Sequence, residues 1–248
     1  TPFHRGGSGP PLVLIHGFSF DLRSWDGQVQ DFARRHRTIR YDLRGFGRSA
    51  LPDAPYSHAD DLRALLRRLG VDRAILVGLS LGANVALAFA LAHPEATAAL
   101  VLASSGLPGH VWRSERPPDT VAAHAQAHGV AAAKAFWLNH ALFDSARDRP
   151  EAIAGLSAMV RDYSGWHWTH GDLHHPLPAI ADRLAEIAAP SLVLTGDRDV
   201  VGYREIGGIL AARLPRARGV VLDGLGHVMS MEDPARFNRA ILDFTAGL

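Results

Sequence analysis

The segment at residues 74–87, with the sequence AILVGLSLGANVAL, limits the possible fold more than any other part of the chain. It begins as a short aliphatic run, typical of a buried strand, and continues as an alanine- and leucine-rich stretch with helical composition. The change from strand-like to helical sequence takes place around Ser80, between Gly78 and Gly82. A turn this tight needs glycine on both sides and holds the serine in a strained conformation, with its hydroxyl at the tip. The segment therefore predicts a strand, a nucleophile elbow and a helix.

The overall composition excludes several classes of protein. With 248 residues the chain can bury a large core as one domain and still carry an inserted subdomain. The formal net charge of +1 creates no field that favours nucleic acid or acidic lipid as a partner. The absence of cysteine excludes disulfides, thiolate metal sites and a cysteine nucleophile. No apolar run has membrane-spanning length and no signal peptide precedes the first strand, so we expect a cytoplasmic protein that does not bind membranes.

Strands and helices alternate around the elbow segment. Besides the elbow strand, we expect buried strands at 11–15, 37–41 and 98–103, a short edge strand at 1–5, and helices at 25–34 and 58–69. This alternation is typical of a parallel sheet whose two faces are both covered by helices. The predicted fold class is therefore α/β, with a mostly parallel central sheet.

The alternation stops at residue 107. Up to residue 186 we find no clear strand, whereas four of the five tryptophans fall in this interval. Helical pieces are expected at 119–128, 130–142 and 151–162, with prolines between them. We interpret 107–186 as a helical cap inserted between two parts of the core, 1–106 and 187–248. Its aromatic side chains are expected mainly to pack the cap on the core, and Trp137, Tyr163 and Trp166 are candidates for lining a substrate pocket.

Two late strands bring chemical groups to the edge of the sheet from which Ser80 projects. The strand at 190–195 leads into Gly196-Asp197-Arg198-Asp199, and the strand at 219–222 leads into a loop that ends with His227. A serine hydroxyl needs a neighbouring base to become a nucleophile, and a histidine base needs an acceptor on its second nitrogen. The chain order of serine, acid and histidine is the one seen when this arrangement is built on an α/β sheet. Either aspartate of the first loop can reach this position.

Other polar motifs have simpler interpretations. His16 follows the first strong strand, and we interpret it as a brace for the following loop instead of as the base. Asp42, with Arg44 and Arg48 close behind it, is interpreted as a charge-braced turn. The histidines between residues 167 and 175, with Asp172, match no metal-ligand spacing, so no metal site is expected.

Taken together, these motifs resemble those of the α/β-hydrolase superfamily over nearly the whole chain. The resemblance implies that Ser80 is the nucleophile, Asp199 the acid and His227 the base, with an oxyanion hole formed by the backbone N–H groups of Phe18 and Leu81. In the family pattern the acid is the fourth residue of a Gly-x-x-Asp turn, which favours Asp199 over Asp197. Ala83 replaces a second glycine that is common after the elbow, the proline common after the acid is absent, and the family's amino-terminal strands are short or missing.

Within the superfamily, the chain looks most similar to the small esterase and lactonase branch, including 3-oxoadipate enol-lactonase-like proteins. The implied reaction is hydrolysis of an ester or lactone through an acyl-enzyme on Ser80, with no cofactor. An aromatic cap without a dense arginine cluster favours a small, mainly apolar substrate, and Arg161 is the candidate partner for a substrate carboxylate. A carbon–carbon bond hydrolase or perhydrolase on the same triad, and a ligand-sensing protein with slow turnover, remain open, as does the oligomeric state.

Overall fold

The computed structural model describes residues 3–171, 173–175 and 179–248. Seven strands form one sheet in the order β1-β3-β2-β4-β5-β6-β7. Their bounds are β1 Phe3–Gly6, β2 Pro11–Ile15, β3 Arg37–Tyr41, β4 Ala74–Leu79, β5 Thr97–Ala103, β6 Ser191–Gly196 and β7 Ala217–Leu222. The edge strand β1 is antiparallel to β3, and all other neighbours in the sheet are parallel. The predicted α/β class and mostly parallel sheet are confirmed.

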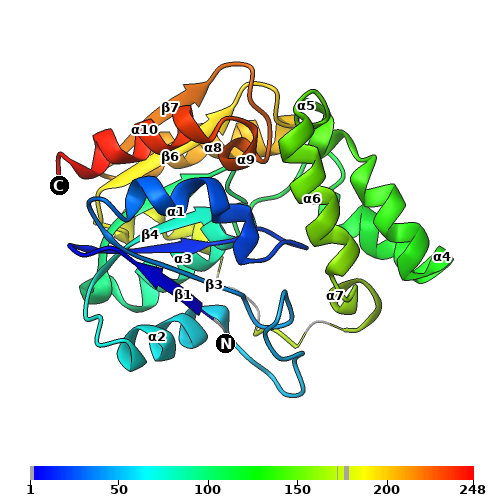
Figure 1. Cartoon of the computed structure of the whole chain (residues 1–248), viewed down its shortest axis with the longest axis horizontal. Helices are drawn as coiled ribbons and strands as arrows, with labels where there is room; N and C mark the ends of the chain where they lie inside the picture. Colours follow the sequence, from blue (N-terminus) through cyan, green and yellow to red (C-terminus); the bar gives the residue numbers. More distant parts are fainter. Residues whose placement is uncertain (1–2, 172, 176–178) are drawn as a thin grey trace.

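Helices connect these strands. The α-helices are α1 Asp26–Phe32, α2 His58–Arg68, α3 Leu81–Ala92, α4 Pro117–Leu138, α5 Asp144–Arg147, α6 Pro150–Asp162, α7 Trp166–Thr169, α8 Val201–Arg213, α9 Met229–Glu232 and α10 Pro234–Thr245. Short 3-10 helices lie at η1 Leu22–Trp25, η2 Pro94–Ala96, η3 Ala141–Phe143, η4 Ile180–Asp182 and η5 Leu184–Glu186. Helices α1 and α10 pack against each other on the side of the sheet nearest the viewer in Figure 1. No helix within the described ranges is long and apolar enough to cross a membrane.

The centre of the sheet explains where the site forms. Strand β4 lies between β2 and β5 and is buried along its whole length, which accounts for its continuous aliphatic sequence. Because β2 and β4 to β7 run in the same direction, their carboxyl ends lie at one edge of the sheet. The loops after β2, β4, β6 and β7 therefore meet at this edge, as ligand sites of open α/β sheets do.

Helices α4 to α7 form a separate group at one side of the sheet (Figure 1). Helix α4 is interrupted at Gly129, whose φ of 83° is non-helical, so its two halves correspond to the predicted helices 119–128 and 130–142. Trp137 and Trp168 are completely buried, as expected for aromatic residues that pack helices together. The assignment of 107–186 as a cap on a core of 1–106 and 187–248 remains our interpretation.

Candidate active site

Ser80 lies at the sharp turn between β4 and α3. Its φ is 55° and its ψ is −110°, a backbone conformation that a residue with a Cβ rarely adopts. Close backbone packing explains the two glycines: a Cβ on Gly78 would lie 2.3 Å from the carbonyl oxygen of Gly82, and a Cβ on Gly82 would lie 2.0 Å from that of Ile15. The Ser80 N–H donates to the Ala103 carbonyl at 2.9 Å, which ties the turn to β5. The strain is thus maintained by the surrounding structure.

His227 and Asp199 form a buried pair at the same edge. Nδ1 of the imidazole lies 3.0 Å from Oδ2 and 3.2 Å from Oδ1 of the carboxylate, and both side chains are almost completely buried. With its N–H donated to the carboxylate, Nδ1 is protonated and Nε2 is left as the basic nitrogen. Ser80 and His227 both line one small void, so the structure brings the three predicted residues together.

The structure also distinguishes the contacts of the two aspartates in the loop after β6. Asp197 is exposed, and its carboxylate accepts the Gly224 N–H at 2.6 Å, which joins the loops that follow β6 and β7. It makes the backbone contact expected of a turn residue. Asp199, in contrast, faces the imidazole of His227.

Glu232, on α9, holds the histidine loop and was missed in the sequence. Its fully buried carboxylate accepts the N–H of Gly226 at 2.7 Å and that of Val228 at 3.2 Å, the residues on either side of His227. It also accepts the Ser145 hydroxyl, and Arg149 lies 3.8 Å away. The acidic pair Glu232-Asp233, directly after the short stretch that follows the histidine, is the signal that could have revealed it.

The loop after β2 and the start of α3 carry the two backbone N–H groups that are expected to form the oxyanion hole. Within the described ranges, neither the Phe18 N–H nor the Leu81 N–H donates to a protein acceptor. Leu81 is the first residue of α3, where the N–H has no partner within the helix. His16 braces this loop as expected: Nδ1 donates to the Gly17 carbonyl at 2.8 Å, and Nε2 accepts the Leu43 N–H at 2.9 Å. Burial lowers the pKa of His16, which favours this neutral form.

The loop after β3 is braced differently from the prediction. The buried carboxylate of Asp42 accepts the backbone N–H groups of Leu22 and Arg48, at 2.8 and 2.9 Å. The guanidinium of Arg44 pairs with Asp61 on α2, at 2.6 Å, instead of with Asp42. The turn is therefore held by an aspartate bound to backbone amides, and it connects the loops that follow β2 and β3.

A cavity of about 450 Å³ opens in front of Ser80. Its walls combine apolar and polar groups from the loops after β2, β4 and β5 and from α3, α4 and α8: Phe18, Ser80, Leu81, Asn84, Gly106, Leu107, Pro108, Gly109, His110, Trp112, Ser114, Arg116, Pro118, Asp119 and Tyr203. Arg116 pairs with Asp119 at 2.5 Å near the start of α4. A void of about 10 Å³ lies between Ser80 and His227 and is lined by Phe18, Phe20, Ser80, Pro118, Trp137, Leu142, Phe143, Tyr203 and His227.

The four residues predicted to bind substrate lie in different places. Trp137 lines the small void, and its indole N–H donates to the Ser19 hydroxyl at 2.8 Å. Tyr163 lines a second cavity of about 440 Å³, together with Phe20 and Arg23. Trp166 stacks on His170 and is not among the residues that line these cavities.

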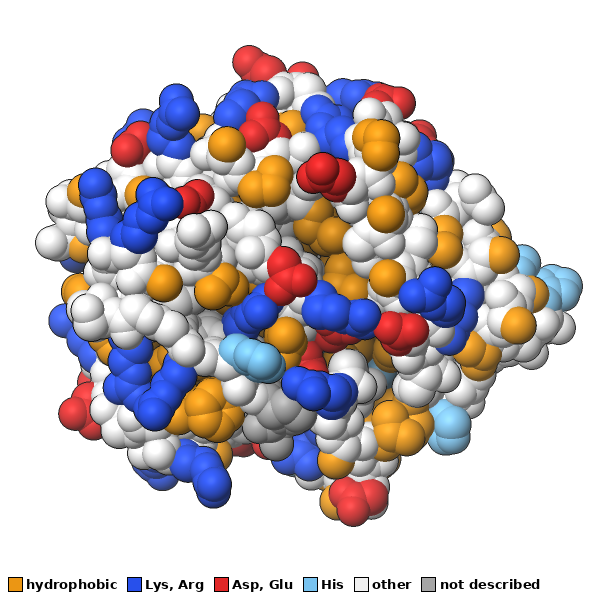
Figure 2. Space-filling view, viewed as in Figure 1, with side chains coloured by type: hydrophobic (Ala, Val, Ile, Leu, Met, Phe, Trp, Pro, Cys, Tyr) orange, Lys and Arg blue, Asp and Glu red, His pale blue; other side chains and the backbone are white. Residues whose placement is uncertain are grey.

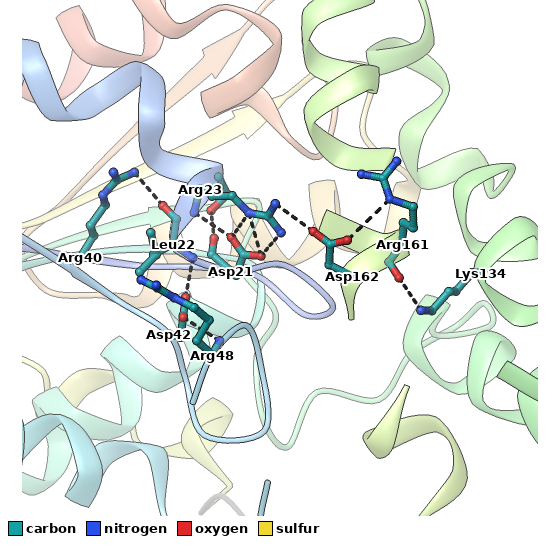
Figure 3. Close-up of polar contacts among 10 residues, drawn as sticks. Asp21, Leu22, Arg23, Arg40, Asp42, Arg48, Lys134, Arg161 and Asp162 are labelled. Carbon is teal, nitrogen blue, oxygen red and sulfur yellow. Dashed lines mark hydrogen bonds and ion pairs between the residues drawn. The ribbon is translucent and has the colours of Figure 1, made fainter. Parts of the chain in front are cut away.

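Arg161 is also absent from these cavity walls. Its side chain is 74 % exposed and lies 3.6 Å from Asp162, while its carbonyl accepts from Lys134. Figure 3 shows Asp162 between Arg161 and Arg23, and Arg23 in turn binds Asp21. These contacts join α6 to the loop that precedes η1. Arg161 therefore belongs to a surface ion-pair network.

Charged side chains of both signs and histidines can be placed in the structure. In Figure 2, basic and acidic side chains are interspersed over the face that is drawn. Within the described ranges there is no group of three or more histidine, aspartate or glutamate side chains placed to hold a metal ion. His167, one of the histidines considered for a metal site, bonds instead to the Tyr163 hydroxyl at 2.9 Å and stacks on Phe46. Asp172 lies outside the described residues.

Tyr203 is a second residue of this site that the sequence did not reveal. It lies in the first turn of α8 and lines both the large cavity and the small void. Its ring centroid is 4.3 Å from that of His227. Burial raises the pKa of Tyr203 to about 12. The absence of the proline that is common after the acid, here Asp199, was the one unusual sequence feature noted close to Tyr203.

Comparison with known proteins agrees with this geometry. A solved structure of Est816, described as an N-acyl homoserine lactone degrading enzyme, is 32 % identical with a TM-score of 0.82, covering 98 % of this chain and 96 % of that one. The enol-lactonase of Burkholderia xenovorans LB400 is 25 % identical with a TM-score of 0.85, covering 99 % and 96 %.

A curated relative carries the name of another kind of hydrolase. The 2-hydroxy-6-oxononadienedioate/2-hydroxy-6-oxononatrienedioate hydrolase of Paraburkholderia phymatum is 31 % identical, covering 94 % of this chain and 86 % of its own. The family model for the alpha/beta hydrolase fold matches residues 10–234. This chain therefore belongs to the α/β-hydrolase family, in its small esterase and lactonase branch.

Proposed function

We propose that this hydrolase cleaves a carboxylic ester or lactone through an acyl-enzyme on Ser80. The observation that carries the proposal is the buried Asp199–His227 pair, at 3.0 Å, on the same small void as the strained Ser80. A strained serine, a histidine with one nitrogen fixed by a carboxylate, and free N–H groups at the adjacent turn are the parts that acyl transfer requires.

The proposed reaction has two balanced halves. Nε2 of His227 takes the proton of Ser80 as Oγ attacks the substrate carbonyl, and the N–H groups of Phe18 and Leu81 stabilise the oxyanion. Collapse of this intermediate expels the alcohol oxygen, which receives the proton from His227. Water then attacks the acyl-enzyme by the same route, which releases the acid and restores Ser80. Water is the second substrate, and no cofactor takes part.

The dimensions of the site limit the substrate. The void beside His227, at about 10 Å³, is no larger than one water molecule requires, so it does not take an acyl chain. The body of the substrate then occupies the cavity of about 450 Å³. Because Asn84, Ser114 and the Arg116–Asp119 pair share its walls with Phe18 and Trp112, we propose a small substrate that has hydrogen-bonding groups as well as apolar surface. This modifies the mainly apolar substrate expected from the cap composition.

The relative from Paraburkholderia phymatum supports a second candidate, cleavage of a carbon–carbon bond next to a carbonyl by the same triad. The products distinguish the candidates, because an ester yields an acid and an alcohol whereas carbon–carbon cleavage yields an acid and a second carbon fragment. A perhydrolase would form a peracid when hydrogen peroxide is supplied. A ligand-sensing protein would bind its ligand in the large cavity with very slow turnover.

The test is steady-state hydrolysis of p-nitrophenyl esters of increasing chain length, γ-lactones and N-acyl homoserine lactones. We expect turnover by the wild type and a loss of about 10⁴-fold in kcat for Ser80→Ala. Ser8→Ala is the matched control, because Ser8 is an exposed serine in the turn between β1 and β2 and lines none of these cavities, and it should stay within about twofold of the wild type. Equal activity of the two variants would refute the proposal.

A further inference from the structure

Asn84 lies one helical turn after Ser80, in the first part of α3. Its backbone N–H donates to the Ser80 carbonyl at 3.2 Å, so the helix fixes the separation of the two side chains. Residues four apart on a helix share a face, with Cβ atoms about 5–6 Å apart. Both residues line the cavity of about 450 Å³. The Asn84 amide therefore lies at a nearly constant distance from the proposed nucleophile.

The Asn84 amide has an unmet hydrogen-bonding capacity. Its Oδ1 is buried and has no hydrogen-bond partner among the described residues. A buried polar atom without a partner costs free energy, so such atoms are rare in proteins and call for an explanation. His110 Nε2 is a second atom of this kind in the same cavity wall, whereas Arg116 and Asp119 bind each other. Asn84 is the residue whose separation from Ser80 the helix fixes.

Gly106, in the loop after β5, keeps space open beside this amide. A Cβ on Gly106 would lie 2.8 Å from Oδ1 and 2.9 Å from Nδ2 of Asn84. Gly106 also lines the cavity. The terminal torsion of asparagine has a broad, roughly two-fold preference, so the amide can turn either its oxygen or its NH₂ group towards a ligand. Asn84 can thus accept a hydrogen bond from a ligand or donate one to it.

The large cavity is suited to the acyl part of the substrate. In the proposed reaction the leaving oxygen lies next to Nε2 of His227, which protonates it. His227 lines the small void and is not among the residues that line the large cavity. The part of the substrate that extends away from His227, past Ser80 and Asn84, is then the acyl part.

We propose that Asn84 is a specificity-determining residue that selects acyl groups with a carbonyl or hydroxyl oxygen on the third carbon. The inference rests on the proposed function of Ser80 as the nucleophile. With Cβ atoms about 5–6 Å apart and a hydrogen bond of about 3 Å, an oxygen at this position spans the distance from the scissile carbonyl to the amide. An unsubstituted chain leaves the amide unpaired. The substrate class is therefore 3-oxoacyl or 3-hydroxyacyl esters and lactones.

The test compares ethyl 3-oxobutanoate and racemic ethyl 3-hydroxybutanoate with ethyl butanoate, which has the same leaving group and chain length. The measured quantity is the ratio of kcat/KM for each oxygenated ester to kcat/KM for ethyl butanoate. Comparing this ratio between the wild type and a variant removes the reactivity that the oxygen itself confers on the ester. Because both substrates are measured on the same preparation, the ratio does not depend on the fraction of protein that is folded.

Asn84→Leu is the main variant, because leucine has the branched shape of asparagine without its hydrogen-bonding atoms. Asn84→Ala is a second variant, which removes the amide without adding volume. Asn139→Leu is the matched control, because Asn139 is an exposed asparagine at the end of α4 and lines none of the cavities at the site.

We expect Asn84→Leu and Asn84→Ala to lower at least one of the two ratios by about five- to tenfold, the effect of one lost hydrogen bond. The 3-oxo ratio falls if the amide donates to a carbonyl, and the 3-hydroxy ratio falls if it bonds to a hydroxyl. Asn139→Leu should leave both ratios within about twofold of the wild type.

The results that overturn the inference differ from a failure of the proposed function. If both ratios of the Asn84 variants stay within about twofold of the wild type, or fall equally in Asn139→Leu, Asn84 does not select the acyl group. If a fluorophosphonate modifies Ser80 but the wild type hydrolyses neither oxygenated ester, the substrate class is wrong while Ser80 remains a nucleophile. If Ser80 is not modified at all, the proposed function itself fails, and the inference about Asn84 is overturned with it.

Discussion

The Glu232 carboxylate accepts the Gly226 N–H at 2.7 Å, and the same carboxylate accepts the Val228 N–H. The loop that presents His227 is thus anchored on both sides by one buried side chain from α9. Such an anchor has to be an acceptor, because both backbone groups are donors that would otherwise be buried without partners. The position of the proposed base therefore depends on a carboxylate that need not touch the substrate.

We predict that Glu232→Gln reduces the unfolding free energy by about 1–3 kcal/mol and also lowers kcat, because the amide NH₂ group can no longer accept both N–H groups. Urea unfolding and steady-state kinetics measure the two effects. Glu205→Gln is the control, since Glu205 is exposed on α8 and should be neutral. Equal unfolding curves for the two variants would show that the anchor has no energetic role.

The two aspartates of the β6 loop should behave differently. Asp199→Asn is expected to lower kcat by about 10⁴-fold, because an amide does not hold the imidazole in the required tautomer or stabilise its cation. Asp197→Asn should change kcat by no more than about threefold, since its carboxylate accepts only a backbone N–H of an exposed turn. The kinetics of both variants decide the assignment, and a larger loss for Asp197→Asn would reverse it.

The elbow should tolerate no side chain at Gly82. A Cβ there would lie 2.0 Å from the Ile15 carbonyl oxygen and 2.8 Å from that of His16, and these are backbone atoms that cannot move aside as a flexible side chain could. We expect Gly82→Ala to cost more than about 3 kcal/mol of unfolding free energy, which soluble expression and thermal unfolding would reveal. Gly208→Ala on α8, where nothing lies within 4 Å, should be neutral or slightly stabilising. Similar Tm values for the two variants would contradict the packing argument.

Stability should fall in acid because of His58, the first residue of α2. Burial is the main cause that lowers its pKa well below 6.5, and His174, His167, His16 and Arg44 add to the shift. The folded state therefore binds this proton less readily than the unfolded state, so stability is full above pH 6.5 and is lost as the pH falls below that value. A buried histidine of this kind changes the unfolding free energy by up to about 1.4 kcal/mol per pH unit.

The slope of unfolding free energy against pH, measured with urea between about pH 7.5 and 5.5, tests this expectation. His58→Asn should make this slope shallower by the amount that corresponds to the uptake of nearly one proton on unfolding. This holds whatever the effect of the substitution on stability at neutral pH. His128→Asn is the control, because His128 is exposed on α4 and should leave the slope unchanged. An unchanged slope for His58→Asn would mean that His58 takes up a proton equally well in the folded and unfolded states.

Much of the fold could be predicted from the sequence because its causes are local. The aliphatic run of β4, the glycines around Ser80 and the alternation of strands with helices each act within a few residues along the chain. The order of the loops that carry Ser80, Asp199 and His227 follows from the same alternation, since parallel strands bring their carboxyl ends to one edge.

Only the tertiary structure decided which side chains face one another at that edge. The contacts of Tyr203 with His227, of Trp112 with Tyr203 and of Glu232 with the histidine loop depend on how helices pack, which no short spacing encodes. For the same reason Trp137 lines the void that it shares with Ser80 and His227, whereas Arg161, a similarly good candidate by sequence, lies in a surface ion pair. Local sequence determines the elements and their order, and the packing of distant segments determines the shape of the pocket.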